Sequence, residues 1–334
     1  MSSSTSSSET DPGWGRSLLA CLGTLIGAAL LVLALMVAVD PYDSGKLGLL
    51  GIDGVDNRLT KITAASRARD PDFNAAILGN STAQMIEPAE LSRATGLRFV
   101  QLYMTGAFPR QELAVLDFFL RNHREVGALV IVTDPGWCTH ARAKEEGGVP
   151  FPDWLYDRTV VTYAARLISW QAIEHAFQRI SIGLGRRPRM NPDGFVSYED
   201  IWPPGQFKEV GWPRDPAPAS SAEMRATFPE IAALADIVRA LPADVPVVII
   251  VPPTLATTVP KPGTEAALER SACDAALKKV VAGRPRISYR VDNDLTRDRA
   301  NFADFIHYRP ILARKIEQGI DASLRDGESA KIDF

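Results

Sequence analysis

Residues 73–83 read FNAAILGNSTA, a mostly apolar run that leads directly into Gly79, Asn80 and Ser81. A short apolar run with turn residues behind it predicts a buried β-strand. In an open parallel sheet, ligands bind beyond the carboxyl ends of the strands, where loops lead into helices. Ser81 therefore stands where a functional side chain is expected.

The same alternation of apolar strands and helices continues along the chain. Near-continuous apolar strands separated by helices indicate a parallel sheet covered on both faces. We therefore expect an α/β fold, a three-layer α/β/α sandwich with a parallel sheet. The predicted strands are residues 73–78, 97–102, 128–133, 245–251 and 287–291, and the predicted helices are residues 110–122, 223–241, 264–281 and 310–324.

Residues 136–221 break this alternation and hold five of the six tryptophans. The segment contains one predicted helix, over residues 160–182, among Pro- and Gly-rich loops. We expect an insertion at the tip of the third strand. Exposed tryptophans stack on sugar rings or lie in membrane interfaces, whereas packing within the insertion's own small core is the simpler explanation for any single ring. The five are Trp137, Trp154, Trp170, Trp202 and Trp212.

Residues 17–39 form an uncharged apolar stretch. A helix of this length spans roughly 35 Å, which is enough to cross the hydrocarbon core of a bilayer. A secretory signal peptide has a shorter apolar region and a small-residue cleavage site, which is not convincing at residues 38–40. A buried core helix normally has some polar face. We therefore expect a retained transmembrane anchor, preceded by a disordered polar tail over residues 1–16.

The charges beside this span do not decide its orientation. Arg16 precedes it, and Lys46 and Arg58 follow it within about 20 residues. Beyond the span we expect a membrane-proximal linker over residues 40–72, a main domain over residues 73–325 and a tail over residues 326–334.

The composition is that of an ordinary folded chain and argues against several classes of function. The chain has 334 residues, of which 46% are hydrophobic and 23% charged, and a net charge of −3. A nucleic-acid-binding surface needs concentrated Lys and Arg, so we expect no nucleic-acid partner. Four separated histidines and three cysteines show no metal-ligand spacing, so we expect neither a metal nor another cofactor.

A motif near the C-terminus supplies a chemical partner for Ser81. Residues 301–310 read NFADFIHYRP, with Asp304 three residues before His307. A serine hydroxyl becomes a good nucleophile when a base takes its proton, and a carboxylate holds a histidine base in the right tautomer. Alternatively, Ser81 caps the following helix and His307 is an ordinary capping or core residue. The other histidines, which lack such an acidic partner, are His123, His140 and His175.

These two motifs resemble those of the SGNH (GDSL-type) hydrolase superfamily. The resemblance rests on residues 79–81 after the first strand and on Asp304-x-x-His307 before the last helix, and it covers residues 73–325 outside the insertion. It implies that Ser81 is the nucleophile, His307 the general base and Asp304 the third member of a catalytic triad.

The other motifs of the family are matched only in part. Gly106, after the second strand, matches the family's oxyanion-hole glycine, so the resemblance implies that Ser81 and Gly106 form this hole. The third block usually contains an Asn that donates to the oxyanion, but Asp134 stands in this stretch. An ionised Asp donates no hydrogen bond, and losing one oxyanion donor typically costs about 10²–10³ in rate. Either another donor substitutes, or the protein is a slow, specialised or inactive member. The residues expected to contact substrate are Asn80, Asp134, Trp137 and Arg309.

The α/β-hydrolase fold is a competing interpretation, because residues 79–83 are one residue away from G-x-S-x-G. That fold places its acid and its histidine on separate loops and usually has several strands before the nucleophile. Here Asp304 and His307 are three residues apart, and one predicted strand precedes Ser81. We therefore reject this fold.

The layout of the chain resembles membrane-anchored SGNH-like proteins of bacterial cell envelopes. These include the D-alanyl transfer proteins of teichoic acid and proteins that accompany membrane-bound O-acyltransferases. The alginate O-acetyltransferases share the chemistry but carry an Asp-x-His motif upstream of the Ser, which this chain lacks. The resemblance implies a bacterial inner-membrane protein with a cytoplasmic tail and its main domain in the periplasm. On that side Cys138 and Cys273 could form a disulfide, since Cys21 lies within the span.

Two functions remain as expectations. The first is a serine esterase or O-acyltransferase that acts on acyl esters of a cell-envelope glycan or related polymer. The second is a catalytically weak or inactive accessory protein that binds an envelope glycan or a membrane-bound O-acyltransferase. Both the acyl group and the acceptor stay open.

Overall fold

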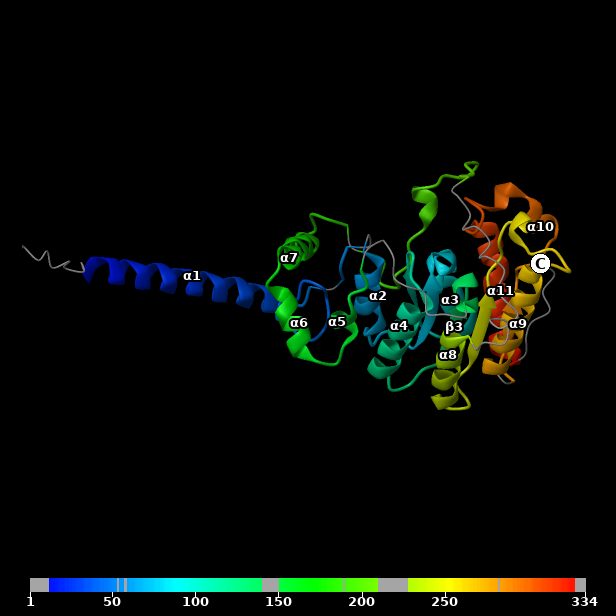
Figure 1. Ribbon diagram of the computed structural model, residues 1–334, viewed down its shortest axis with the longest axis horizontal. Coiled ribbons are helices and arrows are strands. Elements are labelled where there is room, and N and C mark those ends of the chain that lie inside the picture. The colour runs from blue at the N-terminus through cyan, green and yellow to red at the C-terminus, as the bar shows by residue number, and fades with distance from the viewer. Residues whose placement is uncertain are drawn as a thin grey trace, which may run out of the picture. The chain divides into compact units, whose positions relative to one another are not determined.

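The computed structural model describes residues 12–52, 54–56, 59–139, 150–188, 190–209, 228–281 and 283–327. They form a mixed α/β structure (Figure 1). The chain divides into two compact units. The smaller unit consists of Met1–Asp53 and Thr159–Arg187, and the larger unit of Gly54–Arg158 and Pro188–Phe334.

The larger unit contains all the strands of the described chain. The strands are β1 (Ala75–Asn80), β2 (Phe99–Met104), β3 (Ala128–Val132), β4 (Val247–Val251) and β5 (Arg286–Ser288). The helices are α2 (Thr60–Ala68), α3 (Pro88–Thr95), α4 (Pro109–Asn122), α5 (Asp153–Tyr156), α8 (Pro229–Ala240), α9 (Glu265–Val281), α10 (Asp294–Arg297) and α11 (Pro310–Asp326). The short 3₁₀ helices used below are η1 (Ser81–Ala83) and η2 (Pro135–Cys138).

These strands form a parallel sheet in the order β2-β1-β3-β4-β5. The chain passes from β1 to β2 on one side and then to β3 on the other side of β1. The strand order therefore reverses at the carboxyl ends of β1 and β3, which is where ligands bind in open sheets of this kind.

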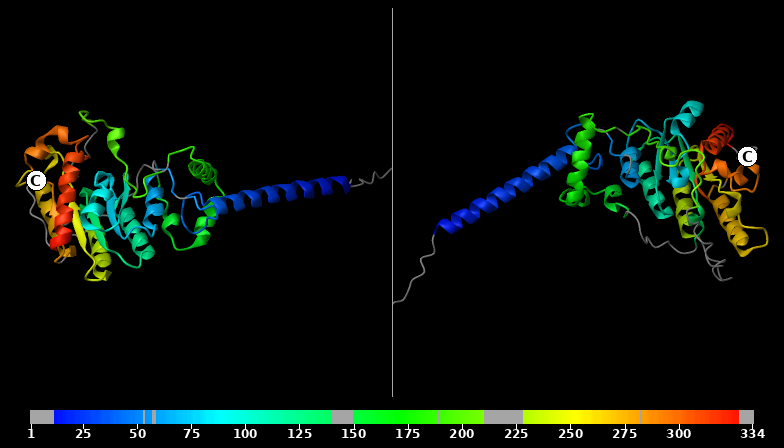
Figure 2. Two further views of the ribbon diagram at one scale, coloured as in Figure 1. Left: turned by 180° about the vertical axis from the view of Figure 1, so that it is seen from behind. Right: turned by 90° about the horizontal axis from the view of Figure 1, so that it is seen from above.

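The side chains on both faces of the sheet are buried. Every residue of β1, β2, β3 and β4 is buried, which explains the near-continuous apolar runs in the sequence. One face packs against α11, whose Ile316 shares a core with Ile77 and Val130. Helix α4 also contacts β1, and α8 contacts both α4 and α9. Figure 2 shows α11, in red, in the view from behind.

The first two strands run two residues further than the apolar pattern predicts. Gly79 and Asn80 pair with Tyr103 and Met104 as the last residues of β1. Gly79 allows a close approach at this point, because a Cβ on it would lie 2.8 Å from the Cβ of Ala83. The polar residues at the end of β1 therefore lie at the carboxyl end of the parallel sheet.

Helix α2 lies inside the segment expected to be a linker, residues 40–72. It contacts β2, and the larger unit begins at Gly54. The boundaries expected from composition therefore differ from the division that the structure shows. Helix α11 ends at Asp326, and most of the expected tail, residues 328–334, lies outside the described residues.

The smaller unit contains α1 (Pro12–Val39), α6 (Val160–Leu167) and α7 (Trp170–Gly183). Within the described chain, α1 is the one helix long and apolar enough to cross a membrane. It begins inside the expected tail of residues 1–16, of which residues 1–11 lie outside the described residues.

The single helix expected over residues 160–182 is two helices, α6 and α7. The chain breaks between them at Ser169, whose hydroxyl accepts a hydrogen bond from the backbone N–H of Ala172 at 3.1 Å. Ser169 is the N-cap of α7.

A buried polar cluster holds the smaller unit together at the end of α1. The Tyr163 hydroxyl of α6 donates to the carboxylate of Asp40. On α7, the Arg179 guanidinium donates to the Asp40 carbonyl and pairs with Asp43 at 3.2 Å. All four residues are buried. The polar groups that follow α1 thus join it to both α6 and α7.

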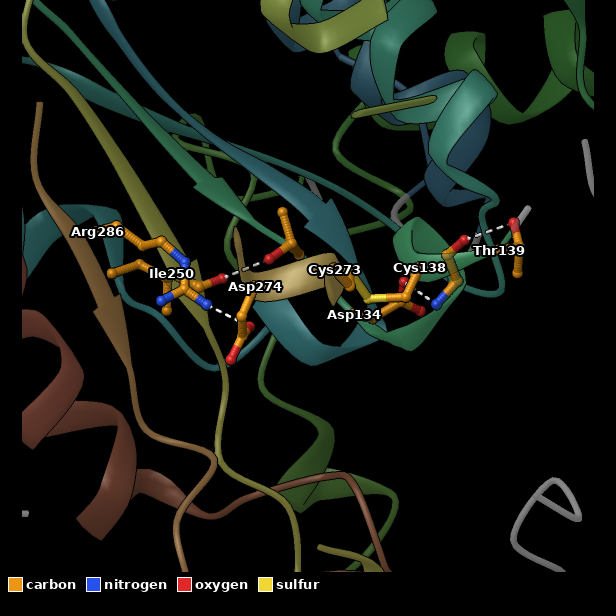
Figure 3. The surroundings of a disulfide bond; sticks show 9 residues. Asp134, Cys138, Thr139, Ile250, Cys273, Asp274 and Arg286 are labelled. Carbon is orange, nitrogen blue, oxygen red and sulfur yellow. Dashed lines mark hydrogen bonds and ion pairs between the residues drawn. A yellow bond between two sulfur atoms is a disulfide. The ribbon is translucent and has the colours of Figure 1, made fainter. Parts of the chain in front are cut away.

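Cys138 and Cys273 form a disulfide, as their position on one side of the span allowed (Figure 3). The bond joins η2, which follows β3, to α9, with 5.4 Å between the Cα atoms. Cys21 is a free, exposed residue of α1. The disulfide ties the segment beyond β3 to a helix that the chain reaches 135 residues later.

Candidate active site

Ser81 follows β1 directly as the first residue of η1. The carboxamide oxygen of Asn80 accepts hydrogen bonds from the backbone N–H and the hydroxyl of Thr82, both at 2.9 Å. Asn80 is therefore the residue that caps this helical turn, a role the sequence left open for Ser81. The Ser81 hydroxyl makes a different contact, with His307.

A short, braced loop carries Asp304 and His307. The backbone N–H of Ala303 donates to the His307 carbonyl at 2.8 Å and closes the loop. From outside the loop, Lys208 donates its backbone N–H to the Ala303 carbonyl at 2.8 Å, and Leu255 donates to the Phe305 carbonyl at 2.9 Å. These backbone contacts hold the loop against two other parts of the chain.

The structure brings Ser81, His307 and Asp304 into one hydrogen-bonded line. His307 Nε2 lies 2.9 Å from Ser81 Oγ, and His307 Nδ1 lies 2.7 Å from Asp304 Oδ2. The other carboxylate oxygen of Asp304 accepts from the backbone N–H groups of Ile306 and His307, both at 2.8 Å. The convergence expected from the two motifs is therefore present, while the catalytic roles remain predictions.

The environment of Asp304 decides which way these hydrogen bonds run. Burial acts to raise the pKa of Asp304, but the His307 ring and the backbone N–H groups of Ile306 and His307 outweigh it and lower this pKa below its ordinary value. An ionised carboxylate only accepts, so His307 Nδ1 must carry a proton. A neutral His307 ring then leaves Nε2 to accept the Ser81 proton. The line is suited to activating a hydroxyl nucleophile.

Two aromatic rings fix the imidazole of His307 from the side. The centroid of Tyr198 lies 5.7 Å and that of Trp202 lies 5.3 Å from the His307 ring, both edge to face. The Tyr198 hydroxyl donates to the backbone carbonyl of Tyr308. No sequence motif singles out Tyr198, and Trp202 was expected only as one of the five tryptophans of the insertion.

Arg309 holds the segment that carries Trp202, and the expectation that it contacts substrate is corrected. Its side chain is 4% exposed. The guanidinium donates to the carbonyls of Trp202 and Pro203, each at 3.0 Å, and of Gln206 at 2.7 Å. It also pairs with Glu199 at 3.2 Å. With these donors engaged, Arg309 is a positioning residue.

Asn80 and Asp134 join the two loops at the point where the strand order reverses. The Asn80 carboxamide N–H donates to Asp134 Oδ2, and Asp134 Oδ1 accepts from the backbone N–H of Gly136 at 2.9 Å. Loss of hydration raises the pKa of Asp134, and the hydrogen bonds from Asn80 and Gly136 oppose this rise. Both side chains, expected to contact substrate, use these polar groups to fix the backbone beside Ser81.

Trp137 is 1% exposed, so the expectation that it contacts substrate is also corrected. Its indole N–H donates to Glu112 Oε2 at 3.3 Å, and the other carboxyl oxygen, Oε1, is buried without a partner among the described residues. Burial raises the pKa of Glu112 well above its ordinary value, and repulsion from Asp134 adds to the rise, while the Trp137 bond opposes it. Glu112 was missed, although it precedes Leu116 and Phe119 by four and seven residues, a spacing that predicts a buried face.

Gly106 lies at the same end of the sheet as Ser81, beyond the carboxyl ends of the strands. It follows β2 by two residues, and Met104 pairs with Asn80, so the two loops leave neighbouring strands side by side. Gly106 has a φ of +62°, which favours glycine. Across the described chain, the backbone N–H groups of Ser81 and Gly106 have no hydrogen-bond acceptor. Both are available to a ligand at this edge.

The other two histidines that the structure describes, His123 and His175, do not join the site. His123 contacts the backbone carbonyls of Phe119 and Asp70, and His175 belongs to the smaller unit. His140 and Trp212 lie outside the described residues. Within the part of the chain that the structure describes, no group of three or more His, Cys, Asp or Glu side chains could hold a metal ion.

In comparisons with known proteins, no family model, no curated protein and no solved structure matches this chain. The roles of the site residues therefore rest on their geometry and chemistry.

Proposed function

We propose that this protein is a serine esterase or O-acyltransferase of the SGNH type. The observation that carries the proposal is the line from Ser81 through His307 to Asp304, with contacts of 2.9 and 2.7 Å. Nucleophile, base and orienting carboxylate stand in the order that acyl transfer needs. The line lies at the carboxyl edge of the sheet, beside the reversal of strand order.

The proposed reaction has two halves. Ser81 Oγ attacks an ester carbonyl while His307 Nε2 takes its proton, and the N–H groups of Ser81 and Gly106 donate to the oxyanion that forms. His307 then gives the proton to the leaving alkoxide, and an acyl-serine remains. In the second half, His307 takes a proton from water or a sugar hydroxyl, whose oxygen attacks the acyl carbonyl. His307 then returns that proton to Ser81 Oγ as the bond between Oγ and the acyl group breaks.

The proposal extends to the architecture of the larger unit, a three-layer α/β/α sandwich. The parallel sheet, the burial of both its faces and the packing of α11 against one of them support this arrangement. The α/β-hydrolase alternative remains disfavoured, since Asp304 and His307 share one loop and β1 is the strand that precedes Ser81.

We also propose that α1 anchors the chain in a bacterial inner membrane and that the larger unit faces the periplasm, where it acts on an envelope glycan or related polymer. The Cys138–Cys273 disulfide supports this side, because such bonds persist in oxidising compartments. After reduction, a membrane-impermeant maleimide that passes the outer envelope should label Cys138, which is partly exposed, in intact cells. Labelling that occurs only after lysis would place the unit on the cytoplasmic side.

A second candidate function is that of a weakly active or inactive accessory protein. The observation that favours it is Asp134, which stands where the family has a donor to the oxyanion and which itself accepts from Asn80. With one donor fewer, turnover about 10²–10³ slower is expected. Such a protein would bind a glycan or a membrane-bound O-acyltransferase.

The deciding experiment is active-site labelling of the full-length protein in detergent with a fluorophosphonate probe. The wild type should be labelled and should hydrolyse a small acetyl ester. Ser81→Ala should lose both activities, and His307→Ala should slow both by about 10²–10⁴. Ser271→Ala, which removes an exposed hydroxyl on α9, is the matched control and should behave as the wild type. Equal labelling of Ser81→Ala, or none of the wild type, refutes the enzymatic proposal.

A further inference from the structure

Helix α7 carries a stripe of exposed apolar side chains. Trp170 and Phe177 of α7 and Leu184, the residue directly after α7, are spaced by seven residues and are 79%, 66% and 61% exposed. Seven residues are close to two helical turns, so the three side chains lie on one face. We call them the α7 stripe. Ala172, Ala176 and Arg179 of the same helix are buried within the unit, so the stripe is a separate apolar face.

Helix α6 adds to this surface at its two ends. Val161 and Ile168 are also seven residues apart, and both are exposed. The buried residues of α6 are Tyr163 and Leu167. Thus the two helices together expose more apolar surface than a soluble unit of this size needs.

The connection between α6 and α7 lies beside the apolar interior of α1. Leu167, Ile168, Ser169 and Ile173 share a groove of about 260 Å³ with residues 28–33 of α1. Those residues precede Asp40 by seven to twelve positions, or about 10–18 Å along the helix axis. Asp40 is the first charged residue after the apolar stretch of α1. The connection between α6 and α7 therefore lies beside a part of α1 that is well inside this apolar stretch.

The orientation of α7 agrees with this depth. In Figures 1 and 2, α7 runs across the direction of α1 rather than along it. If α1 crosses a bilayer, α7 lies in the membrane plane. Amphipathic helices at membrane interfaces adopt this orientation and carry Trp and Phe on the buried face. The polar cluster of Asp40, Tyr163, Arg179 and Asp43 then stands at the end of the hydrocarbon region.

We propose that α6 and α7 form a second membrane-contacting element, with the α7 stripe buried among acyl chains of the leaflet at the C-terminal end of α1. The occupant of the stripe is lipid. The stripe and the apolar surface of α1 belong to one unit, because the buried cluster around Asp40 and Arg179 joins α1 to α7. Lipid that surrounds α1 therefore also reaches the stripe. The inference rests on the membrane crossing by α1 and is independent of the proposed chemistry at Ser81.

The test uses the full-length protein with Cys21→Ser, reconstituted into phosphatidylcholine–phosphatidylglycerol vesicles with its disulfide intact. One cysteine is introduced at a time and labelled with the fluorophore NBD. Phe177→Cys and Leu184→Cys report on the α7 stripe, and Gln171→Cys, at an exposed position about 100° around the helix from Trp170, is the matched control. Leu25→Cys reports on α1. Far-UV circular dichroism confirms that each variant is folded.

Lipids with a spin label on the acyl chain should quench NBD at residues 177 and 184 several-fold more strongly than at residue 171. Emission from the first two should also be shifted to the blue. Quenching at residue 25 without quenching at residues 177 and 184 would overturn the inference while leaving the anchor in place. No quenching at residue 25 would refute the anchor and the inference together. Blue-shifted but unquenched emission at residue 177, with a disulfide-linked dimer of the unlabelled Phe177→Cys variant, would assign the stripe to a protein contact and also overturn the inference.

Discussion

Glu112 carries a buried carboxyl group behind the candidate site. Glu112 accepts a hydrogen bond from Trp137 of η2. Asp134, which directly precedes η2, accepts a hydrogen bond from Asn80, the residue before Ser81. A carboxyl group that burial keeps protonated in the folded chain loses its proton more readily after unfolding. Glu112 therefore couples the stability of this region to pH.

The first prediction concerns Glu112→Gln. Because burial raises the pKa of Glu112 above its ordinary value, the folded chain holds this proton at pH values where the unfolded chain has lost it. The stability of the wild type is therefore fullest below the ordinary carboxyl pKa and falls as pH rises toward the folded pKa, by up to about 1.4 kcal/mol per pH unit. The variant cannot titrate at this position and should gain stability relative to the wild type as pH rises from 5 to 8.

Urea unfolding at pH 5, 6.5 and 8 measures this difference. Asp117→Asn, on the exposed side of the same helix, is the control and should follow the wild type at each pH. A Glu112→Gln protein whose stability difference from the wild type is constant over this range would contradict the prediction.

At the residue scale, sequence motifs singled out Ser81, which follows the first strand, and Asp304 and His307, which precede the last helix. The same reasoning failed for Arg309 and Trp137. Their neighbours in sequence are site residues, but their partners are distant, as Gln206 is for Arg309. A motif shows which residues stand near a site and does not show which way their side chains are engaged.

The segment from Glu199 to Gln206 acts as an element that supports His307 although it contains little regular structure. Arg309 fixes its backbone through the carbonyls of Trp202, Pro203 and Gln206. Trp202 then packs its edge against the imidazole. The position of the His307 imidazole therefore depends on a buried guanidinium two residues away along the chain.

The second prediction follows from this support. In Arg309→Lys, an ammonium group with three N–H donors replaces the guanidinium, which binds three backbone carbonyls and Glu199. At least one buried acceptor therefore loses its hydrogen-bond donor. We expect a loss of about 2–4 kcal/mol in unfolding free energy and a lower kcat for the acetyl ester. Denaturant unfolding and steady-state kinetics measure the two effects.

Arg299→Lys is the matched control, because Arg299 makes an exposed ion pair with Glu209 at 3.1 Å. Its stability should stay within about 0.5 kcal/mol of the wild type. An Arg309→Lys protein with the stability and kcat of this control would show that the segment does not depend on Arg309.

At the element scale, apolar patterns predicted each strand and the main helices, while α2 was missed inside the expected linker. Strand β1 begins and ends two residues later than predicted, because Gly79 and Asn80 continue its pairing with β2. The break between α6 and α7 was missed, although Ser169 carries a recognisable capping signal. Pairing with a neighbouring strand is not visible in the strand's own residues, whereas a cap is.

At the scale of the whole molecule, the Cys138–Cys273 disulfide closes a long loop of chain. It joins η2 to α9 and so links the segment beyond β3 to a distant part of the sequence. A cross-link over so many residues removes much of the freedom of the unfolded chain.

The third prediction is that Cys138→Ser or Cys273→Ser lowers the free energy of unfolding by about 2–5 kcal/mol. Cys21→Ser, which removes the free cysteine of α1, should leave stability unchanged. Thermal unfolding with and without a reducing agent measures the effect, and reduction should bring the wild type to the level of the two variants. Equal melting temperatures with and without reductant would contradict the prediction.

The division into two units was not predictable from composition. Residues 159–187 read as part of an insertion in the main domain, yet they belong with the N-terminal helix. The contacts that place them there join Arg179 to Asp43 and Tyr163 to Asp40, more than 120 residues apart. Contacts of such separation leave no periodic signal in a single sequence.

If α1 anchors the chain as proposed, this division has a consequence for proteolytic release from the membrane. The chain passes from one unit to the other three times, after Asp53, after Arg158 and after Arg187. A protease that cuts once, near Asp53, severs α1 from the backbone of the larger unit but leaves α6 and α7 covalently attached to that unit and clasped to the severed α1 through Arg179 and Tyr163. Release into solution would require two further cleavages, one on each side of the α6–α7 hairpin. A protein cut once should therefore still sediment with the membrane.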